Sequence, residues 1–252
     1  MSFYDLDKEE RNKLVSTINQ KILSDIEISS DKKIISYFSY EDTYIRKTAY
    51  LAIGKIYIAN PKLRNDILNL LAKLFKSENE KIRQTVINAA GEIGIIDFNP
   101  IEKLMELGLF DEHHSVRNAV IGSIKKMSEK NPGPTIAFAH RFLHHEDYEI
   151  RREICHGIEL RGRTHPQDIL PLLKELQHDK KPRVRNTLIH VLGQIAYKKG
   201  CLATVIADLK TWENKELVQK ALAEIIDVHE RYKNFSVLTQ TQAIDFIEKN
   251  FP

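Results

Sequence analysis

A three-residue pattern recurs six times along this chain, at a spacing close to that of one helical hairpin. Its copies are Tyr44-Ile45-Arg46, Lys81-Ile82-Arg83, Ser115-Val116-Arg117, Glu149-Ile150-Arg151, Arg183-Val184-Arg185 and the degenerate Glu216-Leu217-Val218. The third residues, here called anchors, stand 37, 34, 34, 34 and 33 positions apart. A fixed period of this length is typical of a solenoid, in which each unit buries its apolar face only against its neighbours. The sequence therefore predicts a repeat protein with an extended surface, which favours the binding of something large.

Each copy of the pattern opens an apolar helix. Apolar residues follow at offsets −1, +3, +4 or +6 and +7 from the anchor, as Val184, Leu188, Val191 and Leu192 do in the fifth copy. This period of 3.6 with a wide apolar stripe indicates helices covered by neighbours on both sides. Residue types that cap helices stand four positions before the anchor, at Asp42, Asn79, Asp147 and Asn214.

A second, shorter apolar helix is expected in each unit, for example over 67–75, 136–143 and 169–176. Prolines stand at or near the starts of these helices, where a missing N–H does little harm. They are Pro61, Pro100, Pro132, Pro134, Pro166 and Pro171. Gly54, Gly91 and Gly193 share one offset in the longer helices, which indicates close approach between helices.

These units resemble the HEAT-repeat superfamily: a first helix, a tight turn carrying Asp or Asn, and then Val or Ile followed by Arg at the start of a second helix. The resemblance covers roughly residues 31–231, and capping helices are expected over 7–26 and 239–249. We therefore expect an all-α fold, a right-handed α-α superhelix (HEAT-like solenoid) of about six helical hairpins. It would form one domain over residues 1–252, with an N-terminal cap at 1–30, six repeats at 31–231 and a C-terminal cap at 232–252.

The composition fits a soluble protein of the cytoplasm. Apolar residues make up 42% and charged residues 29% of the chain, and no apolar run approaches the ~18 residues of a membrane span. Residues 1–13 are polar, so we expect no secretory signal. Cys155 and Cys201, the two cysteines, lie in helical patterns and are expected to be reduced core thiols. The net charge of +3 is too small to identify a partner.

In HEAT-like proteins the second helices line the inner surface, so their polar positions are candidate binding residues. Offsets +1, +5, +8 or +9 and +12 share one helix face, which in units two to five collects Asn, Gln, His, Arg and Tyr. These types make directed hydrogen bonds, whereas a merely solvated face would be rich in Lys and Glu. The candidates are Arg152, His156, Arg163, Asn186, His190, Gln194 and Tyr197.

Positive charge gathers nearby. Residues 180–199 hold Lys180, Lys181, Arg183, Arg185, Lys198 and Lys199 and no Asp or Glu, with the lysine pairs at opposite ends of one helix. Such a patch can neutralise phosphates or meet an acidic protein surface, so the expected partner is nucleic acid (DNA) or an acidic protein. The anchor arginines, by contrast, are expected to pair with the acidic cap of their own or the next unit.

A narrower resemblance runs from Arg151 to Pro166, which reads RREICHGIELRGRTHP, and continues in Ile169-Leu170-Pro171-Leu172-Leu173. This stretch looks like the HEAT-like DNA alkylation repair glycosylases, which grip the DNA backbone and excise alkylated bases with help from an aspartate and tryptophans. Here Trp212 is the only tryptophan, and the polar stripe has no Asp before Asp227. We therefore expect a non-catalytic binding protein. The alternative is a glycosylase in which Glu159 stabilises the developing positive charge.

Histidines raise the possibility of a metal. His156 and His190 share one offset in adjacent helices, with Glu159 one turn from His156, and this set could hold iron or zinc. A HEAT-like iron hydroxylase family carries His-Glu pairs that recur inside such helices, and no such recurrence is found in this chain. Stacked histidines more often hydrogen-bond to each other or to water, so no metal and no cofactor are expected. Arg161-Gly162-Arg163 fits either a tight helix end or a phosphate contact.

Overall fold

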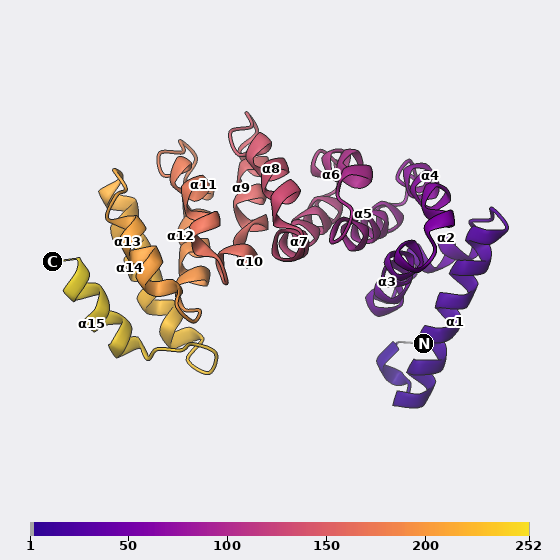
Figure 1. Ribbon diagram of the computed structural model, residues 1–252, viewed down its shortest axis with the longest axis horizontal. Coiled ribbons are helices and arrows are strands. Elements are labelled where there is room, and N and C mark those ends of the chain that lie inside the picture. The colour runs from indigo at the N-terminus through magenta and orange to yellow at the C-terminus, as the bar shows by residue number, and fades with distance from the viewer. Residues whose placement is uncertain (1–2, 252) are drawn as a thin grey trace. The chain divides into compact units, whose positions relative to one another are not determined.

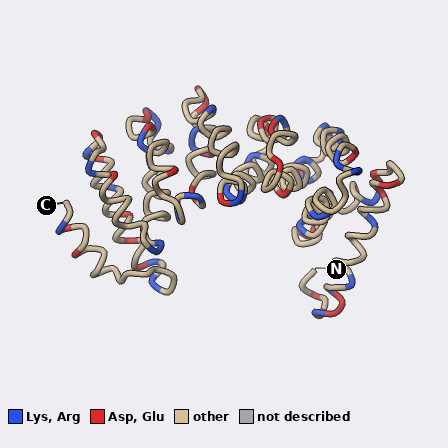
Figure 2. Tube along the Cα trace, in the orientation of Figure 1, with Lys and Arg blue, Asp and Glu red and all other residues tan. Residues whose placement is uncertain are grey.

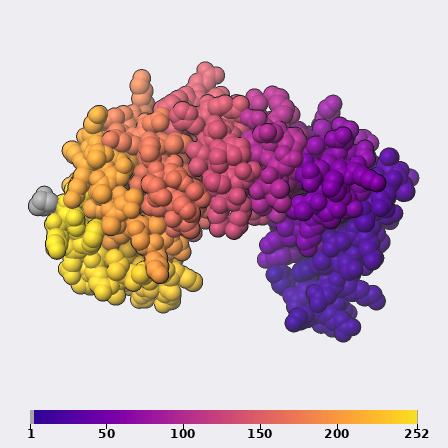
Figure 3. Space-filling model, in the orientation of Figure 1, coloured from indigo at the N-terminus to yellow at the C-terminus, as the bar shows by residue number. Residues whose placement is uncertain are grey.

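The computed structural model describes residues 3–251, and these form helices and turns without a β-strand. The all-α repeat architecture predicted from the sequence is confirmed (Figure 1). The chain divides into two compact units, Met1–Pro134 and Thr135–Pro252. Within each unit the repeats follow one another in chain order and pack in direct contact, as the successive colours show (Figure 3). The expectation of one continuous domain stays a prediction beside this division.

The first unit consists of repeats built from pairs of helices. Its elements are η1 (Phe3–Asp5), α1 (Lys8–Glu27), α2 (Lys32–Phe38), α3 (Thr43–Ala59), η2 (Pro61–Leu63), α4 (Arg64–Leu74), α5 (Glu80–Gly94), η3 (Asn99–Ile101), α6 (Glu102–Leu109) and α7 (His114–Lys130). The longer helices α1, α3, α5 and α7 each pack against the next in this order. The shorter helices α2, α4 and α6 pack against α3, α5 and α7 respectively, so each hairpin closes on its own second helix.

The second unit repeats this plan. Its elements are α8 (Pro132–Phe142), whose first turn contains the division, α9 (Tyr148–Gly157), α10 (Glu159–Gly162), η4 (Pro166–Asp168), α11 (Leu170–Glu175), α12 (Pro182–Ala196), α13 (Cys201–Leu209), α14 (Lys215–Arg231) and α15 (Gln240–Asn250). Helix α12 packs between α9 and α14, and α15 packs on α14. The predicted fourth long helix is interrupted at Ile158, which separates α9 from the short α10.

Side-chain caps fix where the long helices begin. The predicted caps Asp42, Asn79, Asp147 and Asn214 each accept a backbone N–H from the first turn of α3, α5, α9 and α14, which satisfies donors that the helix leaves open. The sequence pattern missed His113, whose ring accepts the N–H of Ser115 and caps α7. Asp7 and Thr239 open the two capping helices, each in a reciprocal capping box, within one residue of the predicted bounds.

The core of each unit consists mainly of aliphatic side chains contributed by neighbouring repeats. Ile53, Ile87, Ile154 and Leu188 are fully buried members of it. The predicted close approach at the shared glycine offset is also confirmed. A Cβ placed on Gly54 would lie 2.7 Å from Glu92 Cβ of the next long helix, and one on Gly193 would lie 2.8 Å from Glu224 Cγ. A side chain at this offset would therefore push consecutive repeats apart.

None of the helices within residues 3–251 combines the length and the apolar character that crossing a bilayer requires.

Candidate functional site

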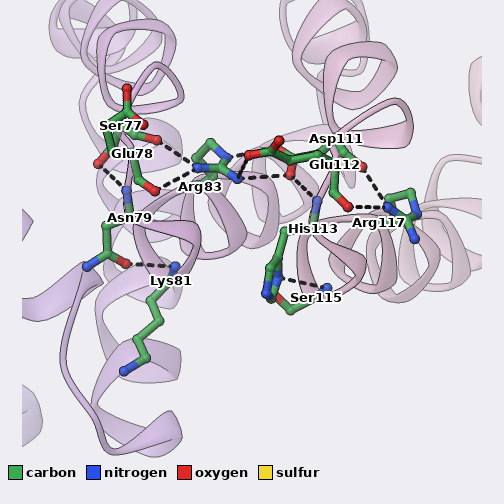
Figure 4. Close-up of polar contacts among 10 residues, drawn as sticks. All are labelled: Ser77, Glu78, Asn79, Lys81, Arg83, Asp111, Glu112, His113, Ser115 and Arg117. Atoms are coloured by element: carbon green, nitrogen blue, oxygen red, sulfur yellow. Dashed lines mark hydrogen bonds and ion pairs between the residues drawn. The ribbon is translucent and has the colours of Figure 1, made fainter.

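The anchor arginines hold the turn that precedes their own helix. Each directs Nη1 to backbone carbonyl oxygens five or six residues earlier, as Arg83 does to those of Ser77 and Glu78, and Arg117 to those of Asp111 and Glu112 (Figure 4). Arg46, Arg151 and Arg185 make the same contact. Because these carbonyls belong to the tight turn of the repeat, the arginine fixes the angle between the two helices of a hairpin.

Two anchors also reach the next repeat. Arg83 donates from Nε to Asp111 Oδ2 at 2.8 Å and from Nη2 to Oδ1 at 3.1 Å (Figure 4). Arg151 binds Asp179 in the same way, at 2.6 and 3.0 Å. The sequence predicted pairing with the acidic cap of the anchor's own or the next unit. The partners of these two anchors lie instead in the turn of the next unit, two residues before its caps His113 and Lys181, and the arginines serve the fold. The carbonyl contacts were not predicted, since they follow from the shape of the turn.

A polar network, absent from the repeat consensus, links three successive long helices of the second unit. It comprises His156, Glu159, Arg163, His190, Gln194, Glu224 and Arg231. His156 Nε2 lies 3.1 Å from Glu159 Oε2, and the other carboxylate oxygen, Oε1, accepts from Arg163 Nη2. The same guanidinium nitrogen donates to Gln194 Oε1 at 2.9 Å.

The network continues onto α14. His190 Nδ1 lies 3.6 Å from Glu224 Oε1, which also accepts from Arg231 Nη2 at 2.7 Å. That hydrogen bond from Arg231 to Glu224 raises the pKa of the Arg231 guanidinium. His156 and His190 face each other edge to face, with ring centroids 6.0 Å apart. Four of the predicted site residues (His156, Arg163, His190 and Gln194) and the candidate catalytic residue Glu159 are therefore brought together.

Sequence reasoning did not select Glu224 or Arg231. Glu224 stands at offset +6 from the sixth anchor, Val218, where the other units carry an uncharged and mostly small residue: Ala52, Ala89, Ser123, Gly157 and Val191. A charged residue at this offset was therefore the signal that could have found it. Gln194 is 4% exposed and Glu159 1%, so part of the network is buried, which the polar character of the positions did not reveal.

Arg152 and Arg183 form a second cluster around one carboxylate. Glu149 Oε2 accepts from Arg152 Nε at 2.8 Å, and its Oε1 lies 3.0 Å from Arg183 Nη1. Arg152 also approaches Glu153 Oε1 at 3.5 Å. These ion pairs connect α9 with the start of α12, so both arginines are engaged within the protein.

The two lysine pairs lie at opposite ends of α12, as predicted. The helix between them has 15 residues and is therefore about 22 Å long. Lys181 Nζ lies 5.5 Å from the centre of the Tyr148 ring, and Lys198 Nζ lies 4.4 Å from that of Tyr197. Among the described residues, Lys180 and Lys199 form no ion pair, and both are exposed. The four lysines are thus two separate positive points rather than one patch.

Tyr197 and Asn186 occupy different environments. Tyr197 is 5% exposed and stacks on Tyr232 of the next repeat, with centroids 5.3 Å apart. It supports the packing of α12 on the following turn and offers little surface to a partner. Asn186 is exposed and lines a hollow of about 100 Å³ between α12 and α14, together with Arg185, Asn214 and Lys220.

The groups required for base excision are poorly placed. Glu159 is buried and paired with Arg163 and His156. Trp212 is fully buried, and its Nε1 donates to Asp208 Oδ2 at 2.6 Å. Arg161 pairs with Asp168, and Arg163 ends α10, so the Arg161-Gly162-Arg163 segment forms a tight helix end. Burial also raises the pKa of Cys155, which makes this thiol a poor nucleophile.

Acidic side chains are interspersed with the basic ones. Both acidic and basic residues are distributed over the second unit (Figure 2). On α14, next to α12, exposed or half-exposed acidic residues stand at Glu216, Glu224, Asp227 and Glu230. The basic stretch from 180 to 199 is therefore balanced in space by carboxylates from the following repeat.

Comparison with known proteins agrees with the repeat analysis. A family model describing HEAT repeats matches residues 32–125 and 136–226. A comparison with curated proteins finds no match.

Among solved structures, YibA of Escherichia coli is 19% identical, with 97% of this chain and 89% of that chain covered and a TM-score of 0.45. An archaeal protein of HEAT-like repeats from Thermococcus onnurineus is 14% identical, with 86% and 97% covered and a TM-score of 0.40. A chain from a structure of Kap95p with RanGDP is 14% identical, with 79% and 30% covered and a TM-score of 0.48. Since the family model accounts for more than half of its residues, the chain belongs to the HEAT-repeat family.

Proposed function

We propose that this chain is a non-catalytic HEAT-repeat scaffold that binds a protein partner carrying acidic groups. The contact surface is the face of α9, α12 and α14 in the second unit. Lys180, Lys181, Lys198 and Lys199 supply charge at its two ends. Asn186 and His190 supply hydrogen bonds between them.

The observation that carries this proposal is the internal pairing of the arginines. Arg152, Arg163 and Arg183 all bind carboxylates of the same chain. A phosphate that recruited them would have to break ion pairs that are already formed. The lysines remain, about 22 Å apart in two pairs.

A polyanion fits this pattern poorly. Duplex DNA carries about one negative charge per 1.7 Å of its axis, and a continuous basic stripe is the usual complement. The acidic side chains of the neighbouring α14 pair with Lys220, Arg231 and Lys233, so this helix does not extend the basic stretch. A protein surface with a few acidic side chains can instead meet each lysine pair separately, and directed polar groups between the pairs would set its register.

The test compares two quadruple variants of the chain. In the first, Lys180, Lys181, Lys198 and Lys199 are changed to Glu. In the control, the exposed lysines Lys8, Lys13, Lys62 and Lys76 of the first unit are changed to Glu. Each change subtracts two charges, so both variants move from +3 to −5 (3 − 8) and differ only in where the charge is lost.

We expect the wild type and the control to retain the same binding proteins from the cells that make this chain, and the first variant to lose them. Cross-linking and mass spectrometry identify these proteins.

Binding to fluorescent duplex DNA, plain and alkylated, should be weak and equal for all three at about 150 mM salt. Tight, salt-sensitive DNA binding that only the first variant loses would replace the protein partner with nucleic acid. Release of a free base from the alkylated duplex would establish the glycosylase alternative.

A further inference from the structure

We propose that His156, Glu159 and His190 form a binding site for a divalent transition-metal ion, with zinc as the best fit. The three residues come from α9, α10 and α12, so two adjacent repeats build the site. It does not depend on the protein partner proposed above.

Geometry is the first support. Each of the three side chains offers one ligand atom, and these atoms all lie within 4.8 Å of one another. The His156 Nε2 and Glu159 Oε2 atoms are 3.1 Å apart. Two ligand atoms on a tetrahedral zinc ion, each about 2.0–2.1 Å from the metal, stand roughly 3.3 Å apart, so this pair is already at coordinating distance. The His190 side chain, which is 42% exposed, completes the set from α12.

The choice of residue types is the second support. Neutral imidazole nitrogens and a carboxylate oxygen form a donor set that zinc binds well. Three protein ligands leave one coordination position open, as in zinc sites that take a further ligand. Sequence alone favours histidines that bond to each other or to water, but the carboxylate that the fold places beside them makes a third ligand.

The surroundings of Glu159 are the third support. Ligating carboxylates are themselves held by hydrogen bonds from a second layer of residues. Here Arg163 binds the Oε1 atom of Glu159 and, through Gln194 Oε1, is tied to α12. This contact holds the carboxylate so that Oε2 faces His156. The Nε2 atom of the buried Gln194 has no hydrogen-bond partner among the described residues. This amide group can therefore still donate a hydrogen bond beside the site.

Opposite charges keep the site from repelling a cation. Glu159 lies beside His156 and Glu224 beside His190, and each carboxylate is paired with an arginine, Arg163 and Arg231 respectively. The surroundings of an ion at this site would therefore carry no net charge while both imidazoles are neutral.

Another set of the same residue types provides the matched control. His144 Nε2 lies 2.6 Å from Glu175 Oε2, and His140 Nε2 lies 3.7 Å from Glu175 Oε1. These side chains are exposed, with 59% and 61% of the two histidines open to solvent. They are the most obvious competing place for a metal to bind at the surface.

The experiment titrates the tag-free full chain with zinc chloride in a calorimeter, and with cobalt chloride while visible absorption is recorded, because cobalt reports tetrahedral coordination. We expect one zinc ion per chain and a rise in melting temperature on binding. His156→Ala and His190→Ala should each weaken zinc binding at least tenfold, whereas the double variant His140→Ala, His144→Ala should retain it.

His190 is partly exposed, so His190→Ala keeps the test sound even if His156→Ala destabilises the chain; circular dichroism checks both. The proposal fails if zinc does not bind, if both single variants bind it as the wild type does, or if only the His140, His144 double variant loses it. In the last case the exposed pair is the site. In the first two the His156–Glu159 contact is an ion pair with no role for a metal.

Discussion

Asp179 joins two repeats through one carboxylate. It accepts two hydrogen bonds from Arg151 of the preceding repeat and one from the backbone N–H of Lys181, at 2.8 Å. Its backbone carbonyl accepts from Arg185, the anchor of its own repeat. Burial opposes ionisation here, but the hydrogen bonds from Arg151 and Lys181 outweigh it and lower the pKa of Asp179 below its ordinary value. One residue thus holds a turn, a helix start and an interface between repeats.

Asp179→Asn should lower the free energy of unfolding by about 3 kcal/mol, because it leaves a buried guanidinium without its carboxylate. The side chains of Arg151 and Asp179 are only 13% and 5% exposed, so solvent screens the pair little. Urea denaturation measures the change. Glu216→Gln is the control, since Glu216 and Lys220 form an exposed pair that solvent screens, and its loss should change stability far less than the loss of the Asp179 carboxylate. Equal losses of unfolding free energy in the two variants would contradict a stabilising role for the Arg151–Asp179 pair.

The same residue predicts a dependence on acid. Because the folded-state pKa of Asp179 is lowered from 3.8, its contribution to stability is complete above that value and is lost as the pH falls below it. Asp111, bound by Arg83, behaves alike: burial opposes its ionisation, but hydrogen bonds lower its pKa. The unfolding free energy of the wild type should therefore fall steeply below about pH 4, and that of Asp179→Asn less steeply. Parallel pH profiles would show that this carboxylate does not titrate with unfolding.

At the scale of helices, the contact between α5 and α7 depends on a glycine. A Cβ on Gly91 would lie 2.6 Å from Ser123 Cβ and 3.3 Å from its Cα, which are too close to the backbone to move aside. Gly91→Ala should therefore lower stability by about 1–3 kcal/mol, despite the better helix propensity of alanine.

Gly122, one residue away from Ser123 on α7, is the control for Gly91. A Cβ there would meet no atom within 4 Å. Gly122→Ala should thus raise stability by roughly 0.5–1 kcal/mol through helix propensity alone. Thermal and urea unfolding of both variants measure the difference. If Gly91→Ala is as stable as Gly122→Ala, the two helices have enough freedom to separate, and their close approach does not constrain the repeat.

The elements of this fold were largely predictable because each depends on local chemistry. The 34-residue step, the caps such as Asn79 and the two capping helices all follow from residues near one another in sequence. Side-chain environments were less predictable. Tyr197 is buried because Tyr232, in the next repeat, covers it, and Arg183 is engaged by Glu149 of the preceding repeat. Such partners lie about one repeat away, where a single sequence does not specify which side chains meet.

Some of the candidate site was nevertheless present in the sequence. Glu159 and Arg163 stand four residues apart, the spacing at which helical side chains meet, so their pairing could have been predicted. The separation of the two lysine pairs by one helix was predicted. Once the carboxylates of α14 were located, it followed that the lysines form two separate positive points and not one positive patch. The offsets of His156, Glu159 and His190 already grouped them as a possible metal site. How closely their ligand atoms approach, within 4.8 Å of one another, required the structure.

For the whole molecule, the division into two compact units has consequences for cooperativity. In a repeat protein each unit contacts mainly its neighbours, so a local loss of stability spreads over a limited distance. Gly91 belongs to the first compact unit and Asp179 to the second. The two substitutions therefore make a matched pair of local perturbations, one in each unit.

Hydrogen exchange followed by mass spectrometry should resolve where each perturbation acts. Asp179→Asn should raise the exchange of amides in α9 and α12 by up to about a hundredfold, in line with its expected loss of stability, and leave α3 and α5 near their wild-type rates. Gly91→Ala should do the reverse, with faster exchange in α5 and α7. If either substitution instead accelerates exchange throughout residues 3–251, the repeats open as one cooperative body. The boundary between Pro134 and Thr135 would then be a feature of packing and not of stability.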